Sequence, residues 1–186
     1  MSLKNAVFII SILTGFVLIV GPFFPEIYLP VKKIVSPVKT LKGEHVSNVE
    51  YNKIIIPKIE VNSKIYESDL ENLDNVLLNG PTRKYNSSDP VTGGNTVIVA
   101  HRIDAITGPN TFYHLPKLAK DDEIQIVWDK NIYNYKVYET FEVDPSDLSV
   151  EENTFDSILT LYTCAPLIDF SKRFVVRAKL DTTLNY

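Results

Sequence analysis

The pattern of hydrophobic and polar positions changes near residue 51. Before it lies one long uncharged apolar stretch, residues 6–24, and after it come short apolar or alternating runs rich in Val, Ile, Tyr and Phe and bounded by Pro, Gly, Asn or Asp. Runs of this length and composition predict β-strands. We expect strands at residues 54–57, 96–101, 123–128, 133–143, 158–164 and 173–180. The pattern therefore predicts a mainly β domain over residues 51–186.

Local signals add a hairpin and a few short helices. Asp129-Lys130-Asn131 falls between two strand-like runs and predicts a tight turn. Ser68-Asp69-Leu70-Glu71 has the form of a capping box, with leucines at 73 and 77 to follow, and residues 110–118 are expected to add a turn or two. Many strands, few helices and no internal repeat indicate a barrel or a sandwich.

Residues 1–24 have the pattern of a membrane anchor. The uncharged stretch 6–24, as a helix at about 1.5 Å per residue, reaches roughly 28 Å, close to the ~30 Å of a bilayer core. A cleaved signal peptide is the alternative, but the stretch exceeds the usual ~7–15 apolar residues and no Ala-X-Ala site follows. Lysines flank both ends, so charge alone does not set the orientation. Prolines and lysines in residues 25–50 predict an extended stalk.

Composition excludes some functions and leaves one metal open. A net charge of −4 and a pI near 5.4 argue against a nucleic-acid partner. Three histidines and one cysteine show no zinc-like spacing, and no Gly-rich phosphate loop is present. The acidic segments Asp121-Asp122-Glu123 and Glu151-Glu152 lack an EF-hand pattern and are expected to be solvated turns, with calcium binding as the alternative. We therefore expect no cofactor.

Three side chains at the ends of predicted strands could carry chemistry. Cys164, the only cysteine, ends one apolar run, Arg173 opens the next, and His101 ends the run that begins at residue 96. Together they could supply a nucleophile, an anion stabiliser and an acid/base. Taken alone, a cysteine that follows a strand is more often an inert core residue.

Other histidines and arginines compete for these roles. His45 lies in the predicted stalk and is expected to be solvated, whereas His114 is expected to pack against or cap a short helix. Arg83 lies in a polar loop, Arg102 follows His101, and Arg177 lies four residues after Arg173 on the same face of an extended strand. Arg173 is preferred because it stands at the start of its strand.

Two segments and one arginine resemble a known family. Asn95-Thr96-Val97-Ile98-Val99-Ala100-His101-Arg102 and Thr160-Leu161-Tyr162-Thr163-Cys164, with Arg173, resemble the motifs of the sortases, membrane-anchored cysteine transpeptidases of bacterial envelopes. The resemblance extends from about Ile54 to Leu180. Sortases most often carry Gly where this chain has Ala100, a small-for-small change. The resemblance implies a closed eight-stranded β-barrel with short helices on its rim, an N-terminus inside the cell and a catalytic domain outside it.

The resemblance also implies a reaction and its residues. Cys164 would attack the Thr–Gly carbonyl of a Leu-Pro-X-Thr-Gly-like sorting signal on a secreted protein and form a thioester. His101 would protonate the leaving amine and then deprotonate the incoming one, and Arg173 would hold the substrate and the oxyanion. Thr163 and Ala100 are implied to contact the substrate, although a strand threonine is often only a good β-former. The acceptor would be an amine of a cell-wall precursor or of another protein.

Two alternatives remain beside this reading. Sortases devoted to pilus assembly carry an aspartate-proline-aromatic lid motif before the domain and a second apolar anchor after it, and the sequence shows neither pattern. A membrane-tethered extracellular β domain that binds a peptide or protein partner, with a structural Cys164, is the non-enzymatic alternative.

Overall fold

The computed structural model describes residues 51–182, with residues 70, 105–107 and 110 excepted. The predicted anchor, residues 1–24, and the predicted stalk, residues 25–50, lie outside the described residues. Within the described part of the chain, no helix is both long and apolar enough to cross a bilayer.

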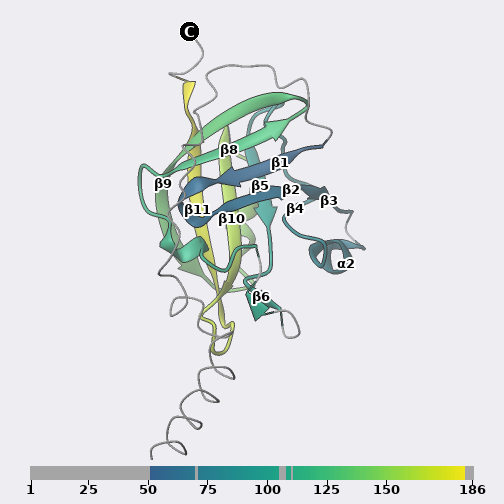
Figure 1. Ribbon diagram of the computed structural model, residues 1–186, viewed down its shortest axis with the longest axis vertical. Helices are drawn as coiled ribbons and strands as arrows, with labels where there is room; N and C mark the ends of the chain where they lie inside the picture. The colour runs from purple at the N-terminus through teal and green to yellow at the C-terminus, as the bar shows by residue number, and fades with distance from the viewer. Residues whose placement is uncertain (1–50, 70, 105–107, 110, 183–186) are drawn as a thin grey trace, which may run out of the picture. The chain divides into compact units, whose positions relative to one another are not determined.

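Nine strands form one curled sheet in the order β2-β1-β8-β9-β11-β10-β5-β4-β3 (Figure 1). Their bounds are β1 (Lys53–Ile56), β2 (Val61–Lys64), β3 (Tyr66–Glu67), β4 (Thr82–Arg83), β5 (Asn95–Val99), β8 (Glu123–Trp128), β9 (Asn131–Val143), β10 (Ile158–Ala165) and β11 (Lys172–Leu180). A separate hairpin pairs β6 (Ile103–Asp104) with β7 (Gly108–Pro109).

The sheet forms a nearly closed barrel. Its two edge strands, β2 and β3, are separated along the chain only by Ile65, so the backbone itself joins the two edges. The mainly β class is confirmed, whereas the expected count of eight strands is wrong. The sheet has nine because the two-residue strands β3 and β4 extend the ladder beyond β5.

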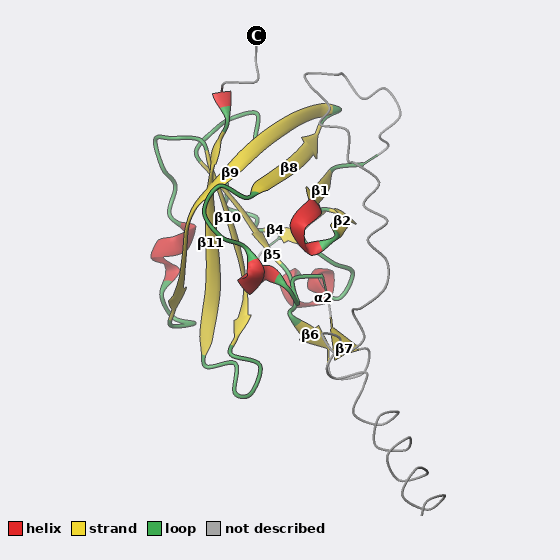
Figure 2. Cartoon of the chain, turned by 60° about the vertical axis from the view of Figure 1, so that its left-hand side comes forward, coloured by secondary structure: helices red, strands yellow, loops and turns green. Residues whose placement is uncertain are grey.

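Among the residues that the structure describes, the helices are few and short, as expected (Figure 2). They are the α-helix α2 (Leu73–Leu77) and the 3₁₀ helices η3 (Pro57–Ile59), η4 (Leu115–Lys117) and η5 (Leu148–Glu151). The predicted capping box at Ser68 is wrong: α2 starts after Asn72, and the Ser68 hydroxyl donates instead to the Arg83 carbonyl, at 3.4 Å. Asp69 is the side chain that bonds the backbone just before α2, because its carboxylate accepts a hydrogen bond from the Asn72 N–H at 2.9 Å.

The turn between β8 and β9 confirms the predicted hairpin. Its two loop residues, Asp129 and Lys130, have φ values of 46° and 65°. Left-handed backbone at both positions is what a two-residue turn requires if it is to match the twist of the strands. Asn131, placed in the turn by the sequence, is the first residue of β9.

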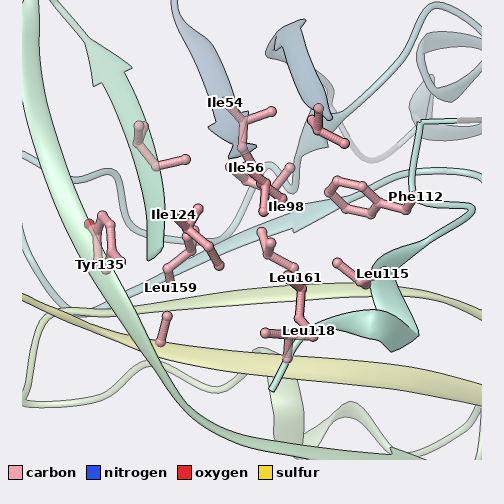
Figure 3. Close-up of a cluster of buried hydrophobic side chains, with 14 of the residues drawn as sticks. Ile54, Ile56, Ile98, Phe112, Leu115, Leu118, Ile124, Tyr135, Leu159 and Leu161 are labelled. Atoms are coloured by element: carbon pink, nitrogen blue, oxygen red, sulfur yellow. The ribbon is translucent and has the colours of Figure 1, made fainter. Parts of the chain in front are cut away.

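The interior of the barrel is filled by aliphatic and aromatic side chains (Figure 3). Leu159 and Leu161 of β10 are fully buried there, as are Ile54 and Ile56 of β1. Tyr135 is buried among them, and burial raises the pKa of its phenol, a shift that a hydrogen bond with Thr96 opposes.

A second, smaller cluster covers the outer face of the same strands. Val97 and Val99 of β5 pack with Leu77 of α2, and Leu73 and Tyr162 lie against them. Both faces of β5 are therefore buried, which explains why its residues form a continuous apolar run without polar alternation.

Candidate active site

Cys164 lies on the outer face of the barrel, near the end of β10. Leu161 faces the interior, whereas Tyr162 packs against the outer cluster. Because successive strand residues point to opposite faces, Cys164 shares the outer face with Tyr162. The thiol is unpaired and partly exposed, and a cysteine so placed can meet a substrate that approaches from outside.

Arg173 is the cross-strand neighbour of Cys164, on the adjacent strand β11. The antiparallel pairing of β10 with β11 sets Cys164 opposite Arg173, and residues opposite each other in a pair project from the same face. The Arg173 guanidinium donates to the backbone carbonyls of Phe170, at 3.4 Å, and Lys172, at 3.2 Å. Within the described residues it forms no ion pair with a carboxylate.

The other three arginines have hydrogen-bond or ion-pair partners of their own. Arg177 forms an ion pair of 3.4 Å with Glu139, and its guanidinium lies 5.4 Å from the centre of the Phe141 ring. Arg83 pairs with Glu67 at 2.9 Å. Arg102 donates from Nε to the Tyr113 carbonyl at 3.3 Å. Arg173 is thus the arginine that pairs opposite Cys164 and, among the described residues, forms no ion pair with a carboxylate.

His101 reaches the same place through a parallel pairing. β5 and β10 run parallel up to the pair Val99 and Tyr162, and the Ala100 N–H donates to the Tyr162 carbonyl at 3.5 Å. Extending this register by two residues, past Ala100 and Thr163, sets His101 level with Cys164. The catalytic roles of these two residues and of Arg173 stay predictions. His114 instead stands just before η4, with its ring edge-on to Tyr113 at 4.9 Å.

Thr163 and Ala100 face the interior of the barrel. They are 2% and 4% exposed, and the Thr163 hydroxyl donates to the Ala100 carbonyl at 2.8 Å. This hydrogen bond ties the end of β5 to β10, directly before His101 and Cys164. A contact of either residue with the substrate stays a prediction.

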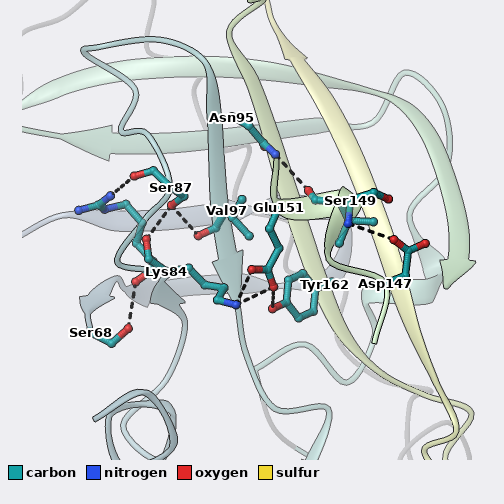
Figure 4. A network of polar contacts seen from close by, with 11 residues as sticks. Ser68, Lys84, Ser87, Asn95, Val97, Asp147, Ser149, Glu151 and Tyr162 are labelled. Carbon is teal, nitrogen blue, oxygen red and sulfur yellow. Dashed lines mark hydrogen bonds and ion pairs between the residues drawn. The ribbon is translucent and has the colours of Figure 1, made fainter. Parts of the chain in front are cut away.

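A polar network around Glu151, which sequence reasoning missed, includes Tyr162, two residues before Cys164 (Figure 4). The Tyr162 hydroxyl donates to the Glu151 carboxylate at 2.6 Å, and the Lys84 ammonium donates to the same Oε1 at 2.6 Å. Burial and the Glu151 carboxylate raise the pKa of Tyr162, whereas Arg173 lowers it. A phenol is protonated at neutral pH even at its ordinary pKa, and the upward shift of the Tyr162 pKa extends its role as a hydrogen-bond donor to higher pH. The expectation that Glu151 is a solvated turn residue is therefore wrong.

Asn95 fixes the backbone on both sides of Glu151. It is fully buried, and its amide donates to the carbonyls of Val150, at 3.0 Å, and Glu152, at 2.9 Å. Its own carbonyl oxygen accepts from the Thr160 hydroxyl at 2.8 Å. Asn95 thereby attaches η5 to β5 and β10.

No group of three or more His, Cys, Asp or Glu side chains among the described residues is arranged to hold a metal ion. Of the acidic residues considered for calcium, Asp122 accepts from Lys58 and from the Ala119 N–H, each at 2.7 Å. The expectation that the protein needs no cofactor stays a prediction.

Comparison with known proteins assigns the family. The family model of the Sortase domain matches residues 54–181. Sortase A of Listeria monocytogenes is 30% identical over 166 residues, which cover 86% of this chain and 68% of the relative. Sortase A of Bacillus anthracis is 31% identical over 132 residues, 70% of this chain and 60%, less than two thirds, of the relative.

Solved structures agree with the sequence relatives. A Clostridium perfringens Sortase D5 transpeptidase has a TM-score of 0.61 and 33% identity, covering 70% of this chain and 78% of that one. Sortase A of Listeria monocytogenes has a TM-score of 0.59 and 27% identity, covering 75% and 89%. The chain belongs to the sortase family, and it is an enzyme of the sortase type, a cysteine transpeptidase.

Proposed function

We propose that this protein cleaves a Leu-Pro-X-Thr-Gly-like sorting signal at the C-terminal end of secreted proteins and transfers them to an amine of the cell envelope. The observation that carries the proposal is that Cys164 pairs opposite Arg173 near the end of β10. Strand β5 pairs with β10 and leads into His101 at the same end of the sheet. Two segments distant in sequence meet there, because β5 pairs with β10 of the β10–β11 hairpin, and together they supply the proposed nucleophile, cation and base.

The proposed reaction proceeds in two acyl transfers. The Cys164 sulfur attacks the threonine carbonyl, the C–N bond to glycine breaks, and His101 gives a proton to the leaving amine. The resulting thioester is attacked by an acceptor amine, which loses a proton to His101 as the C–S bond breaks. Arg173 stabilises the oxyanion of both tetrahedral intermediates, and the absence of an ion-paired carboxylate among the described residues leaves its charge available.

The proposal places the enzyme at the cell membrane. Residues 6–24 would span the bilayer once, residues 25–50 would form the stalk, and the β-barrel would work outside the cytoplasm. The acceptor would be an amine of a cell-wall precursor or of another envelope protein. We also propose that no metal is needed, since Lys84 and Lys58 already neutralise Glu151 and Asp122.

A small thiol reagent is expected to label Cys164 rapidly in the native protein, and a Leu-Pro-X-Thr-Gly peptide is expected to slow the labelling. The residue is the only cysteine, so mass spectrometry of the intact protein reports on it alone. A scrambled peptide is the control and should have no effect. Slow labelling that matches a buried thiol, or labelling indifferent to both peptides, would favour the non-catalytic β domain that binds a partner.

The full-length protein is expected to stay in the membrane fraction through a high-pH carbonate wash, because residues 6–24 match the thickness of a bilayer. A variant that lacks residues 1–50 should be found in the supernatant. Immunoblots of both fractions make the measurement. Release of the full-length protein by carbonate would contradict the membrane span.

A further inference from the structure

The chain leaves the sheet at His101. Both ladders of β5, with β4 and with β10, end at Val99. Ala100 is still tied to β10, because its carbonyl accepts from the Thr163 hydroxyl at 2.8 Å. His101 lies one residue further along, so its backbone depends on contacts outside the strand ladders.

Residues 112 and 113 supply two such contacts to His101 and the residue after it. The Phe112 N–H donates to the His101 carbonyl at 3.2 Å, and the Arg102 Nε donates to the Tyr113 carbonyl at 3.3 Å. One hydrogen bond therefore runs in each direction between the two segments. Together these two hydrogen bonds form the 101–113 clamp.

The second side of the clamp is anchored in the barrel core. Phe112 is fully buried, and Leu115 and Leu118 are buried in the same cluster (Figure 3). The Phe112 carbonyl also accepts from the Leu115 N–H at 3.1 Å, which ties it to η4. Because a shift of Phe112 would disturb a close-packed core, the clamp joins His101 to a rigid part of the domain.

Between the two sides of the clamp the chain makes a short excursion. β6 starts at Ile103, directly after Arg102, and pairs with β7, which ends at Pro109. An isolated two-stranded hairpin is at best marginally stable in water. The clamp lies at the base of this hairpin and keeps its motion from reaching His101.

We propose that Arg102 is a positioning residue for acid/base catalysis by His101. By donating from Nε to the Tyr113 carbonyl, it keeps the 101–113 clamp closed and the His101 backbone fixed at the level of Cys164. The inference rests on the proposed function, since it takes His101 as the group that protonates the leaving amine. A proton donor has to lie within hydrogen-bond reach of the atom that it protonates, so loss of its backbone support slows proton transfer.

The first test compares three substitutions of Arg102 in the full-length protein in detergent. Gln places an uncharged N–H donor where arginine has Nε, whereas Met and Lys place a carbon there and Lys alone keeps the charge. Arg102→Met and Arg102→Lys are expected to lower kcat for a sorting peptide about fivefold with KM within about twofold, and Arg102→Gln should stay within about twofold of the wild type in both constants.

Arg177→Met is the matched control. It is the same substitution at an arginine whose Nε has no hydrogen-bond partner among the described residues, so kcat should stay within about twofold of the wild type. Thermal melts of all the variants show whether each one is folded. An equal fall of kcat in Arg177→Met and Arg102→Met would overturn the inference.

A change of leaving group separates the positioning of His101 from general damage to the site. In a sorting peptide that ends in a threonine aryl thioester, Cys164 displaces a thiolate that needs no proton, so acyl-enzyme formation by Arg102→Met should stay within about twofold of the wild-type rate. With the amide peptide the leaving nitrogen takes a proton, and the same step should be about fivefold slower. Mass spectrometry of single turnovers without an acceptor amine measures both rates.

The last measurement does not depend on turnover. Amide hydrogen exchange of Phe112 should be faster in Arg102→Met than in Arg102→Gln or the wild type. Unchanged kcat in Arg102→Met, equal slowing with both leaving groups, or an equal loss in Arg102→Gln would overturn the inference. Failure of the wild type to cleave any sorting peptide would instead refute the proposed function, and exchange at Phe112 would still report whether Arg102 holds the clamp.

Discussion

Cys164→Ala is expected to abolish cleavage of a sorting peptide while the protein stays folded. The substitution removes the sulfur that would form the thioester, and alanine provides no nucleophile in its place. The side chain is partly exposed on the outer face and lies outside the barrel core, so its loss leaves no cavity. Peptide cleavage is followed by chromatography, and a thermal melt compares the folding of the variant with that of the wild type.

The wild type offers the complementary observation. Incubated with the sorting peptide and no acceptor amine, it should accumulate an acyl-enzyme whose added mass maps to the peptide that contains Cys164, because hydrolysis of the thioester is expected to be slow. Cleavage by Cys164→Ala at a rate matching the wild type would remove this mechanism.

Arg173→Ala is expected to lower kcat/KM at least ~10²-fold, about 3 kcal/mol of transition-state stabilisation. Arg173 pairs opposite Cys164, and its guanidinium has no carboxylate partner among the described residues, so its charge is free to act on an oxyanion. Arg173→Lys keeps the charge but loses the planar fork of donors, and on the order of a tenth of the activity or less should return. The same peptide assay measures each variant.

Arg177→Ala is the matched control for this experiment. Arg177 stands on the same strand and face as Arg173 but is paired with Glu139 and packed on Phe141, so its removal should cost far less activity. An inactive Arg177→Ala beside a nearly normal Arg173→Ala would reverse the assignment of the oxyanion residue, and the pairing of Cys164 with His101 could survive that result.

The long strands could be predicted from sequence because each buries enough apolar surface to carry its own signal. Residues 123–128 match β8 at both ends, and the runs predicted at 158–164 and 173–180 differ from β10 and β11 by one residue. The short strands could not be predicted. β2, Val-Asn-Ser-Lys, is mostly polar, and it forms because β1 offers it a backbone ladder, a tertiary effect that no local pattern contains.

The candidate site was likewise predictable from sequence only in part. That Cys164 and Arg173 end and open neighbouring strands follows from the hydrophobic pattern, but their direct opposition depends on the register of the hairpin. The network around Glu151 has no local signature. Its members, Lys84, Glu151 and Tyr162, are residue types that are common at surface or strand positions. They come together only because residues 144–157 cross over the sheet.

The parallel pairing of β5 with β10 has a consequence for the order of folding. Cys164 and Arg173 sit on one hairpin, a local unit, whereas Thr163 and Ala100 are 63 residues apart, and β8 and β9 lie between them along the chain. Closing so long a loop costs entropy before any contact compensates it, and non-local strand pairing is slow for that reason. During folding, the β10–β11 hairpin would therefore set Cys164 opposite Arg173 before β5 joins β10. The predicted nucleophile would acquire its predicted acid/base partner, His101, only as the barrel closes.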